Sequence, residues 1–182
     1  MILTIPYQAL EISNIHLTPF TYDKYGKSIA RLSYKDNSID FQDVCILSPP
    51  LKVIDYNPES SRLRLDLSEQ QQFLNKLHTL QNYLTSTFFI HQQSFLSITN
   101  KSQDYVSSLF NFLLADSVLN LYIFPTANVK KEDGSTLKVA QLKTGDTIRC
   151  VIRLHGISQI FSKSGAKLRL QHSIPSIWGT FS

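Results

Sequence analysis

Two segments in the last third of the chain place basic side chains on one face of an alternating pattern. The cations are Arg149 and Arg153 in residues 147–155, and Lys167 and Arg169 in residues 166–174. Because successive side chains of a β-strand point to opposite faces, each segment predicts a strand with one apolar and one basic face. If the two strands pair through a turn at residues 162–165, the four cations form one continuous surface. Such a surface can offset the charges of a sugar-phosphate backbone.

Aromatic residues near these cations can stack on unpaired bases, an interaction worth about 1–3 kcal/mol per base. Phe161 and Trp178 flank the basic segments. A second group lies near the N-terminus, where aromatic and basic residues follow one another closely: Tyr22, Lys24, Tyr25, Lys27 and Arg31. We expect its two tyrosines to stack on bases and its three cations to contact the backbone of the same strand.

Other patterns give no indication of catalysis. The acidic residues have no histidine at useful spacing, His155 and His172 alone are not a metal ligand set, and glycine-rich phosphate loops and nucleophile-elbow motifs are missing from the sequence. With 6 glycines in the chain, there is little loop material for a phosphate cradle. The sequence therefore predicts a binding protein without catalytic residues, metal or other cofactor.

The composition is that of a folded, basic protein. Of the 182 residues, 42% are apolar and 18% are charged, which is too apolar and too weakly charged for a disordered chain. The net charge of +4 and the pI of about 9.0 suit a polyanionic partner. Cys45 and Cys150 lie in apolar runs without a disulfide framework, and no segment predicts a membrane-spanning helix or a signal peptide. We therefore expect a cytoplasmic protein that does not bind membranes.

The hydrophobic patterns predict an α+β protein. Strands are expected at residues 29–35, 39–41, 44–47, 52–56, 62–67, 118–124, 136–139, 147–155, 157–161 and 166–174. A long amphipathic helix is expected over residues 73–88, preceded by capping-box spacing at Ser68 and Gln71, and a shorter helix over residues 103–113. Short, evenly spaced strands favour a small antiparallel β-barrel, similar to an oligonucleotide-binding (OB) fold and elaborated by the two helices. We expect one domain over residues 1–182.

Several of these segments resemble the single-stranded DNA-binding proteins of large cytoplasmic DNA viruses and of virus-like linear cytoplasmic plasmids. In the N-terminal half the resemblance lies in residues 46–53 (ILSPPLKV), residues 63–68 (LRLDLS) and the helix through Phe73 and Leu77. In the C-terminal half it lies in strand 121–124, the turns at Gly134 and Gly145, strand 147–155, and residues 167–171 (KLRLQ). The resemblance covers about residues 44–177.

The resemblance implies an OB-like barrel that coats and protects single strands during DNA replication, without sequence preference and without catalysis. Its setting would be the cytoplasm of a host cell or a virion. The expected partner is single-stranded DNA, and replication proteins or further copies of the same chain are candidate protein partners. Two alternatives stay open: a virion-structural or replication-complex interaction subunit with a β-barrel fold, and a single-stranded RNA-binding protein of the same fold.

Overall fold

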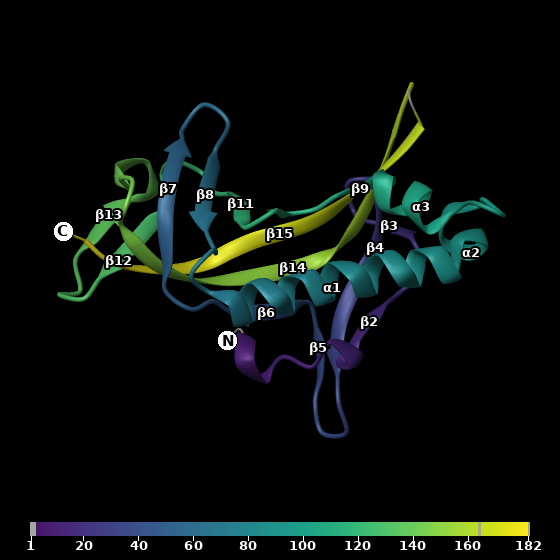
Figure 1. Cartoon of the computed structure of the whole chain (residues 1–182), viewed down its shortest axis with the longest axis horizontal. Helices are drawn as coiled ribbons and strands as arrows, with labels where there is room; N and C mark the ends of the chain where they lie inside the picture. Colours follow the sequence, from purple (N-terminus) through teal and green to yellow (C-terminus); the bar gives the residue numbers. More distant parts are fainter. Residues whose placement is uncertain (1–2, 164, 182) are drawn as a thin grey trace.

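Two long strands form the centre of the molecule. The structure is a computed structural model that describes residues 3–163 and 165–181. Strand β14 (Thr147–Ser162) and strand β15 (Gly165–Thr180) pair antiparallel over nearly their whole length (Figure 1). The predicted pairing of the two basic segments is therefore confirmed, and residue 164 of the predicted turn lies outside the described residues. The prediction of two separate strands at residues 147–155 and 157–161 is wrong, because β14 continues through Gly156.

Five of the remaining strands pair directly with the two outer edges of this hairpin, and the others extend the sheet from these five. Along β14, β7 pairs at residues 147–148, β6 at 151–154 and β4 at 156–158. Along β15, β9 pairs at residues 168–169 and β12 at 178–179. The strands other than β14 and β15 are β1 (Ile5–Pro6), β2 (Ile15–Leu17), β3 (Thr21–Tyr22), β4 (Ser28–Lys35), β5 (Asp40–Gln42), β6 (Val44–Leu47), β7 (Leu51–Asn57), β8 (Arg62–Asp66), β9 (Phe110–Asn111), β10 (Leu114–Ala115), β11 (Val118–Tyr122), β12 (Asn128–Lys131) and β13 (Thr136–Lys138).

The strands and helices together make an α+β protein, as predicted. The main path through the sheet runs β10-β11-β8-β7-β14-β15-β12-β13, and parallel pairs such as β12/β15 accompany the antiparallel ones. The sheet is open and mixed. The strand pairings in the described part of the chain do not include a pair that would close this path into the small antiparallel barrel expected from the sequence.

The long helix α1 (Gln71–Ile90) forms where the apolar spacing predicts it. Its buried side chains recur every three or four residues and form one stripe: Phe73, Leu77, Leu80, Leu84 and Phe88. Leu77 and Leu80 lie beside Ile152 and Leu154 of β14, so α1 packs on the central hairpin. The expected capping box is wrong: Gln70 is the N-cap, and Gln71 Nε2 donates to the Ser68 carbonyl oxygen at 2.8 Å.

The second predicted helix is shorter than expected. Helix α3 (Gln103–Leu109) begins at the N-cap Ser102, whose Oγ accepts the Tyr105 N–H at 3.1 Å. It ends before Phe110 because Phe110 pairs with Leu168 of β15. The patterns did not predict α2 (Gln92–Leu96) or the short 3-10 helices Tyr7–Ala9, Ile12–Asn14 and Val139–Gln141.

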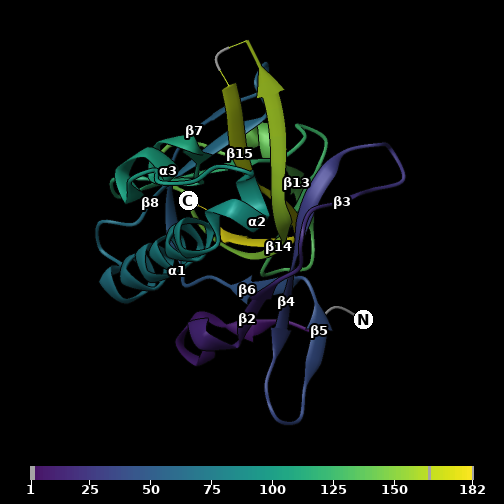
Figure 2. The same ribbon diagram turned by 90° about the vertical axis from the view of Figure 1, so that its right-hand side faces the viewer.

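One contiguous cluster of buried apolar residues extends from Leu10 to Ile177 and joins α1 to the strands. Figure 2 shows α1 to one side of β14, with β2, β4 and β5 lower in the view. Both cysteines are buried and unpaired, and burial raises the pKa of Cys150 to about 12, so its thiol stays protonated at neutral pH.

In the part of the chain that the structure describes, no helix has both the length and the apolar character needed to span a membrane.

Gly156 is required where β4 crosses close to β14. A Cβ at this position would overlap the carbonyl oxygen of Ala30 and come within 3.0 Å of the Arg31 Cα, and both are backbone atoms. We therefore expect Gly156→Ala to lower the free energy of unfolding by about 1–3 kcal/mol, the usual cost of forcing atoms into a packed site. Urea denaturation measures this change. Ile160→Ala, at an exposed position of the same strand, is the control and should cost less than about 1 kcal/mol. An equal loss in both variants would contradict the steric argument.

Candidate nucleic-acid interface

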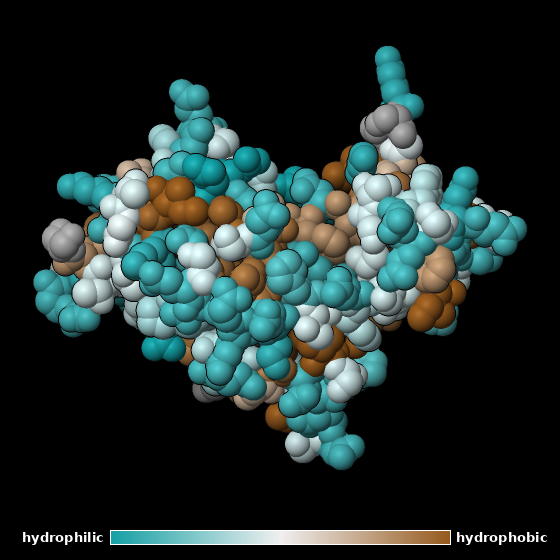
Figure 3. All heavy atoms as spheres, in the orientation of Figure 1, coloured by the Kyte–Doolittle hydropathy of each residue, from teal (hydrophilic) through white to brown (hydrophobic). Residues whose placement is uncertain are grey.

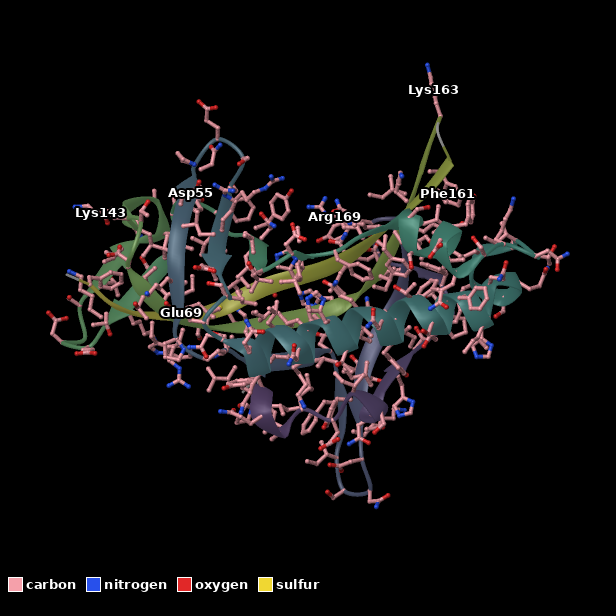
Figure 4. All side chains as sticks on the ribbon, in the orientation of Figure 1. Asp55, Glu69, Lys143, Phe161, Lys163 and Arg169 are labelled. Atoms are coloured by element: carbon pink, nitrogen blue, oxygen red, sulfur yellow. The ribbon has the colours of Figure 1, made fainter. Side chains whose placement is uncertain are left out.

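A pocket of about 170 Å³ opens where β8, β9, β11 and β15 meet. Its polar and aromatic lining residues are Arg62, Asn111, Phe112, Asn120, Tyr122 and Arg169. In Figure 4, Arg169 lies between the β7/β8 hairpin, marked by Asp55, and the tip of the β14/β15 hairpin, marked by Phe161 and Lys163. The space-filling view shows a hollow between these two projections (Figure 3).

Tyr122 contacts two guanidinium groups in this pocket. The Cζ atom of Arg169 lies 4.7 Å from the centre of the Tyr122 ring, and that of Arg62 lies 5.7 Å from it. Arg62 Nη2 also donates to the Tyr122 hydroxyl at 3.1 Å, and this hydrogen bond lowers the pKa of the phenol. Within residues 3–163 and 165–181, neither arginine has a carboxylate partner within 4 Å. We call these three residues the central cluster.

Strand pairing sets the geometry of the central cluster. Arg62 and Tyr122 are direct partners in the β8/β11 ladder, so their side chains lie on the same face. Arg64, two residues along β8, donates from Nε to Asp55 Oδ1 at 2.8 Å, so the nearby carboxylate of Asp55 is engaged by another arginine. Tyr122 is 39% exposed, which leaves part of its ring open to a ligand.

His172 anchors the backbone of Tyr122 to β15. Its Nε2 accepts the Tyr122 N–H at 3.0 Å, so a neutral ring carries its proton on Nδ1. Burial lowers the pKa of His172 to about 4, and the positive charge of Arg169 contributes to the decrease. The imidazole is therefore neutral at pH 7 and remains a hydrogen-bond acceptor for β11.

A second pocket, of about 220 Å³, lies around Trp178 at the other end of β15. Trp178 is 38% exposed, and its direct ladder partners are Arg149 on β14 and Lys130 on β12. Pro50, Thr147 and Lys131 also line this pocket. The structure thus brings together two predicted site residues, Arg149 and Trp178, and adds two lysines that the sequence patterns did not single out.

The predicted continuous row of four cations is wrong at Arg153. The guanidinium of Arg153 lies 2.7 and 2.8 Å from Asp43 Oδ2, and Asp43 is 8% exposed. The buried carboxylate of Asp43 therefore offsets the charge of Arg153, which is partly exposed. Arg149 and Arg169 are separated along the hairpin, because Arg149 pairs with Trp178 and Arg169 pairs with Ser158.

The same carboxylate takes part in a Ser–His–Asp arrangement. His155 Nε2 lies 2.9 Å from Ser173 Oγ, and its Nδ1 lies 3.3 Å from Asp43 Oδ2. Hydrolases use this connectivity to activate a serine. Here Asp43 Oδ2, the oxygen that would orient the imidazole, is already engaged by two nitrogen atoms of Arg153. We therefore interpret the group as a polar cross-link between the β5–β6 connection and the central hairpin.

The N-terminal aromatic and basic residues lie on the other side of β14 from β15. They occupy or flank the turn between β3 and β4, where Asp23 Oδ1 accepts the N–H groups of Tyr25 and Lys27 at 2.8 Å. Tyr22 and Tyr25 are 81% and 82% exposed, and Lys24 Nζ lies 5.0 Å from the Tyr25 ring centre. Lys24, Lys27 and Arg31 are also exposed. Ser158 pairs with Ile29 of β4 and with Arg169 of β15, so β14 separates this group from the central cluster.

Phe161 and Lys167 lie near the tip of the β14/β15 hairpin. Phe161 is 74% exposed and Lys167 is exposed as well. The sequence patterns therefore identified one member of the central cluster, Arg169, and several residues around it. They missed Arg62 and Tyr122, although both lie in segments predicted as strands. The only local sign of these two residues was the strand-like alternation in residues 62–66 and 118–122. The contact between Arg62 and Tyr122 depends on the pairing of strands 60 positions apart, which a local pattern does not reveal.

The described ranges contain no cluster of three or more histidine, cysteine, aspartate or glutamate residues that could hold a metal ion. Comparisons with protein-family models, curated proteins and solved structures gave no match. The resemblance to viral and plasmid single-stranded DNA-binding proteins therefore stays a prediction.

The neutral state of His172 makes stability depend on pH. Its folded pKa of about 4 lies below the ordinary 6.5, so between these values the unfolded chain binds a proton that the folded chain excludes. We expect the protein to lose about 3 kcal/mol of stability from this group as the pH falls from 6.5 to 4, since one pKa unit corresponds to about 1.4 kcal/mol.

His172→Gln removes the titrating ring and keeps a hydrogen-bond acceptor. Urea denaturation of both proteins across this pH range should give a shallower pH dependence for the variant. The other titrating groups are the same in the two proteins, so their contributions to the pH dependence of the free energy of unfolding cancel in the comparison. Parallel curves would show that His172 is not held neutral in the fold.

Proposed function

We propose that this protein binds single-stranded DNA without sequence preference and protects it during replication. The observation that carries the proposal is the central cluster, in which an exposed tyrosine contacts two arginines that have no carboxylate partner in the described part of the chain. Guanidinium groups in this state can bind phosphate oxygens, and the tyrosine ring can stack on a base.

The combination favours single strands over duplexes. A base that is paired and stacked inside a duplex does not present its face to a protein side chain, whereas an unpaired base can stack on an aromatic ring. Every base has such a face, so stacking on Tyr122 carries little sequence preference. The surrounding exposed residues Phe161 and Lys167 supply the same two kinds of contact near the hairpin tip.

We also propose that the strands around the central cluster are a distorted OB-like barrel. The path β11-β8-β7-β14-β15 is continuous in hydrogen-bonded pairs. Tyr122 of β11 donates its N–H to His172 of β15, so one side-chain hydrogen bond spans the place where a closed barrel would have a strand ladder. OB folds bind oligonucleotides on such a surface. A role in the replication of a cytoplasmic virus or plasmid follows from the sequence resemblance and is part of the same proposal.

Binding to labelled single strands tests the function directly. We expect fluorescence anisotropy to show tighter binding to a strand of about 16 nucleotides, the upper end of the usual range per OB fold, than to a duplex of equal length. The affinity should fall as salt rises, with a log–log slope of about −0.7 for each phosphate contacted. Equal affinity for duplex and single strand, or no effect of salt, would refute the proposal. Preference for RNA of the same length would assign the same surface to RNA instead.

Removing one guanidinium of the central cluster should weaken binding and its salt dependence together. For Arg169→Gln we expect about a tenfold loss of affinity, because a hydrogen bond to a charged group contributes about 1.5–3 kcal/mol. The salt slope should become shallower by about 0.7. Lys143→Gln is the matched control, since Lys143 is an exposed cation that Figure 4 shows far from Arg169. Equal effects of the two variants would indicate that only overall charge matters.

A further inference from the structure

We infer that the Trp178 pocket is a second binding station for the strand held at the central cluster, so that full affinity requires a strand long enough to reach both. This inference rests on the proposed function. It concerns the pocket lined by Arg149, Lys130 and Trp178, at the opposite end of β15 from Arg169.

The Trp178 pocket has the chemistry to hold one nucleotide unit. Because ladder partners place their side chains on one face, the indole lies between Arg149 and Lys130. In the described residues neither cation has a carboxylate partner within 4 Å, and Glu132, the acid of this pocket, accepts a hydrogen bond from Thr180 Oγ1 at 3.0 Å. The volume of about 220 Å³ is below the usual range of about 300–1,000 Å³ for larger ligands, which suits a single base with its phosphate.

The chain itself connects the two stations. Residues 122–130 begin at Tyr122 of the central cluster and end at Lys130, the ladder partner of Trp178. Between them, Phe124 is 77% exposed while its neighbour Ile123 is 5% exposed. An aromatic ring exposed on this connecting segment offers a further stacking surface, so the route carries three exposed rings: Tyr122, Phe124 and Trp178.

The length of β15 sets the length of strand required. Arg169 and Trp178 are nine positions apart, which at about 3.3 Å per strand residue corresponds to about 30 Å. A single strand with bases stacked at about 3.4 Å spacing covers this distance with about nine nucleotides. That number lies within the range of about 4–16 nucleotides known for OB folds. Strands of about 12 nucleotides should therefore reach both stations, and strands of about 4 should not.

Trp178 is the chain's single tryptophan, so its fluorescence reports occupancy of the second station. We expect a strand of about 12 nucleotides to quench this emission, with a midpoint equal to that of anisotropy. Arg169→Gln should raise both midpoints by the same factor of about ten, because one strand occupies both stations. A quenching midpoint that Arg169→Gln leaves unchanged would show two independent sites and overturn the inference.

Phe124→Ala tests the route between the stations. We expect at least a fivefold loss of affinity for the strand of about 12 nucleotides and no loss for one of about 4, since a stacked base contributes about 1–3 kcal/mol. Tyr105→Ala is the control, because Tyr105 is an exposed aromatic beside a cation, Lys101, on α3. Equal losses in the two variants, or equal losses for both strand lengths, would overturn the route.

The outcomes separate the inference from the function beneath it. Anisotropy that detects no binding at any length refutes the proposed function as well. Binding without quenching of Trp178 at any length refutes only the second station. Quenching by a strand of about 4 nucleotides with the same midpoint as one of about 12 also refutes it, because length would then have no effect.

Discussion

Two 16-residue strands, β14 and β15, present backbone groups along both of their outer edges, and five other strands pair directly with these edges. Unpaired strand edges are prone to pairing with other chains. Here three strands from the first third of the sequence, β4, β6 and β7, cover the outer edge of β14 in succession. These three strands can therefore complete their pairing only against the C-terminal hairpin. The close approach at Gly156 fixes where β4 can lie.

Ion pairing decides which cations of this framework can bind a polyanion. Arg153 and Arg64 are engaged by Asp43 and Asp55, and a polyanion would have to displace these acids. Arg62 and Arg169 have no such partner in the described ranges, so no carboxylate would compete with a phosphate for them. Arginine also keeps its charge throughout the physiological pH range and can bind phosphate with two hydrogen bonds. The position of the acids therefore defines the proposed binding surface as much as the position of the basic residues does.

Local patterns in the sequence predicted the elements that local forces determine. The stripe from Phe73 to Phe88 gave α1, and the alternation around Arg149 and Arg169 gave the central hairpin. Patterns could not show that Arg153 is neutralised, because its partner Asp43 lies 110 positions away in the sequence. They likewise could not pair Arg62 with Tyr122. Such contacts depend on how strands that are distant in the sequence pair with one another. This pairing also gives an open sheet, whereas the even spacing of strands along the sequence favoured a closed barrel.

His172 links the geometry of the central cluster to its charge. The ring holds β11 in place as a neutral acceptor, and the adjacent charge of Arg169 helps to keep its pKa low. A phosphate bound at Arg169 would offset that positive charge and so raise the pKa of His172, because an anion favours protonation nearby. By linkage, binding of this phosphate would be accompanied by proton uptake at pH values near the pKa of His172. In the ligand-free protein the ring is neutral near pH 7, so it holds Tyr122 in position beside the two charged arginines.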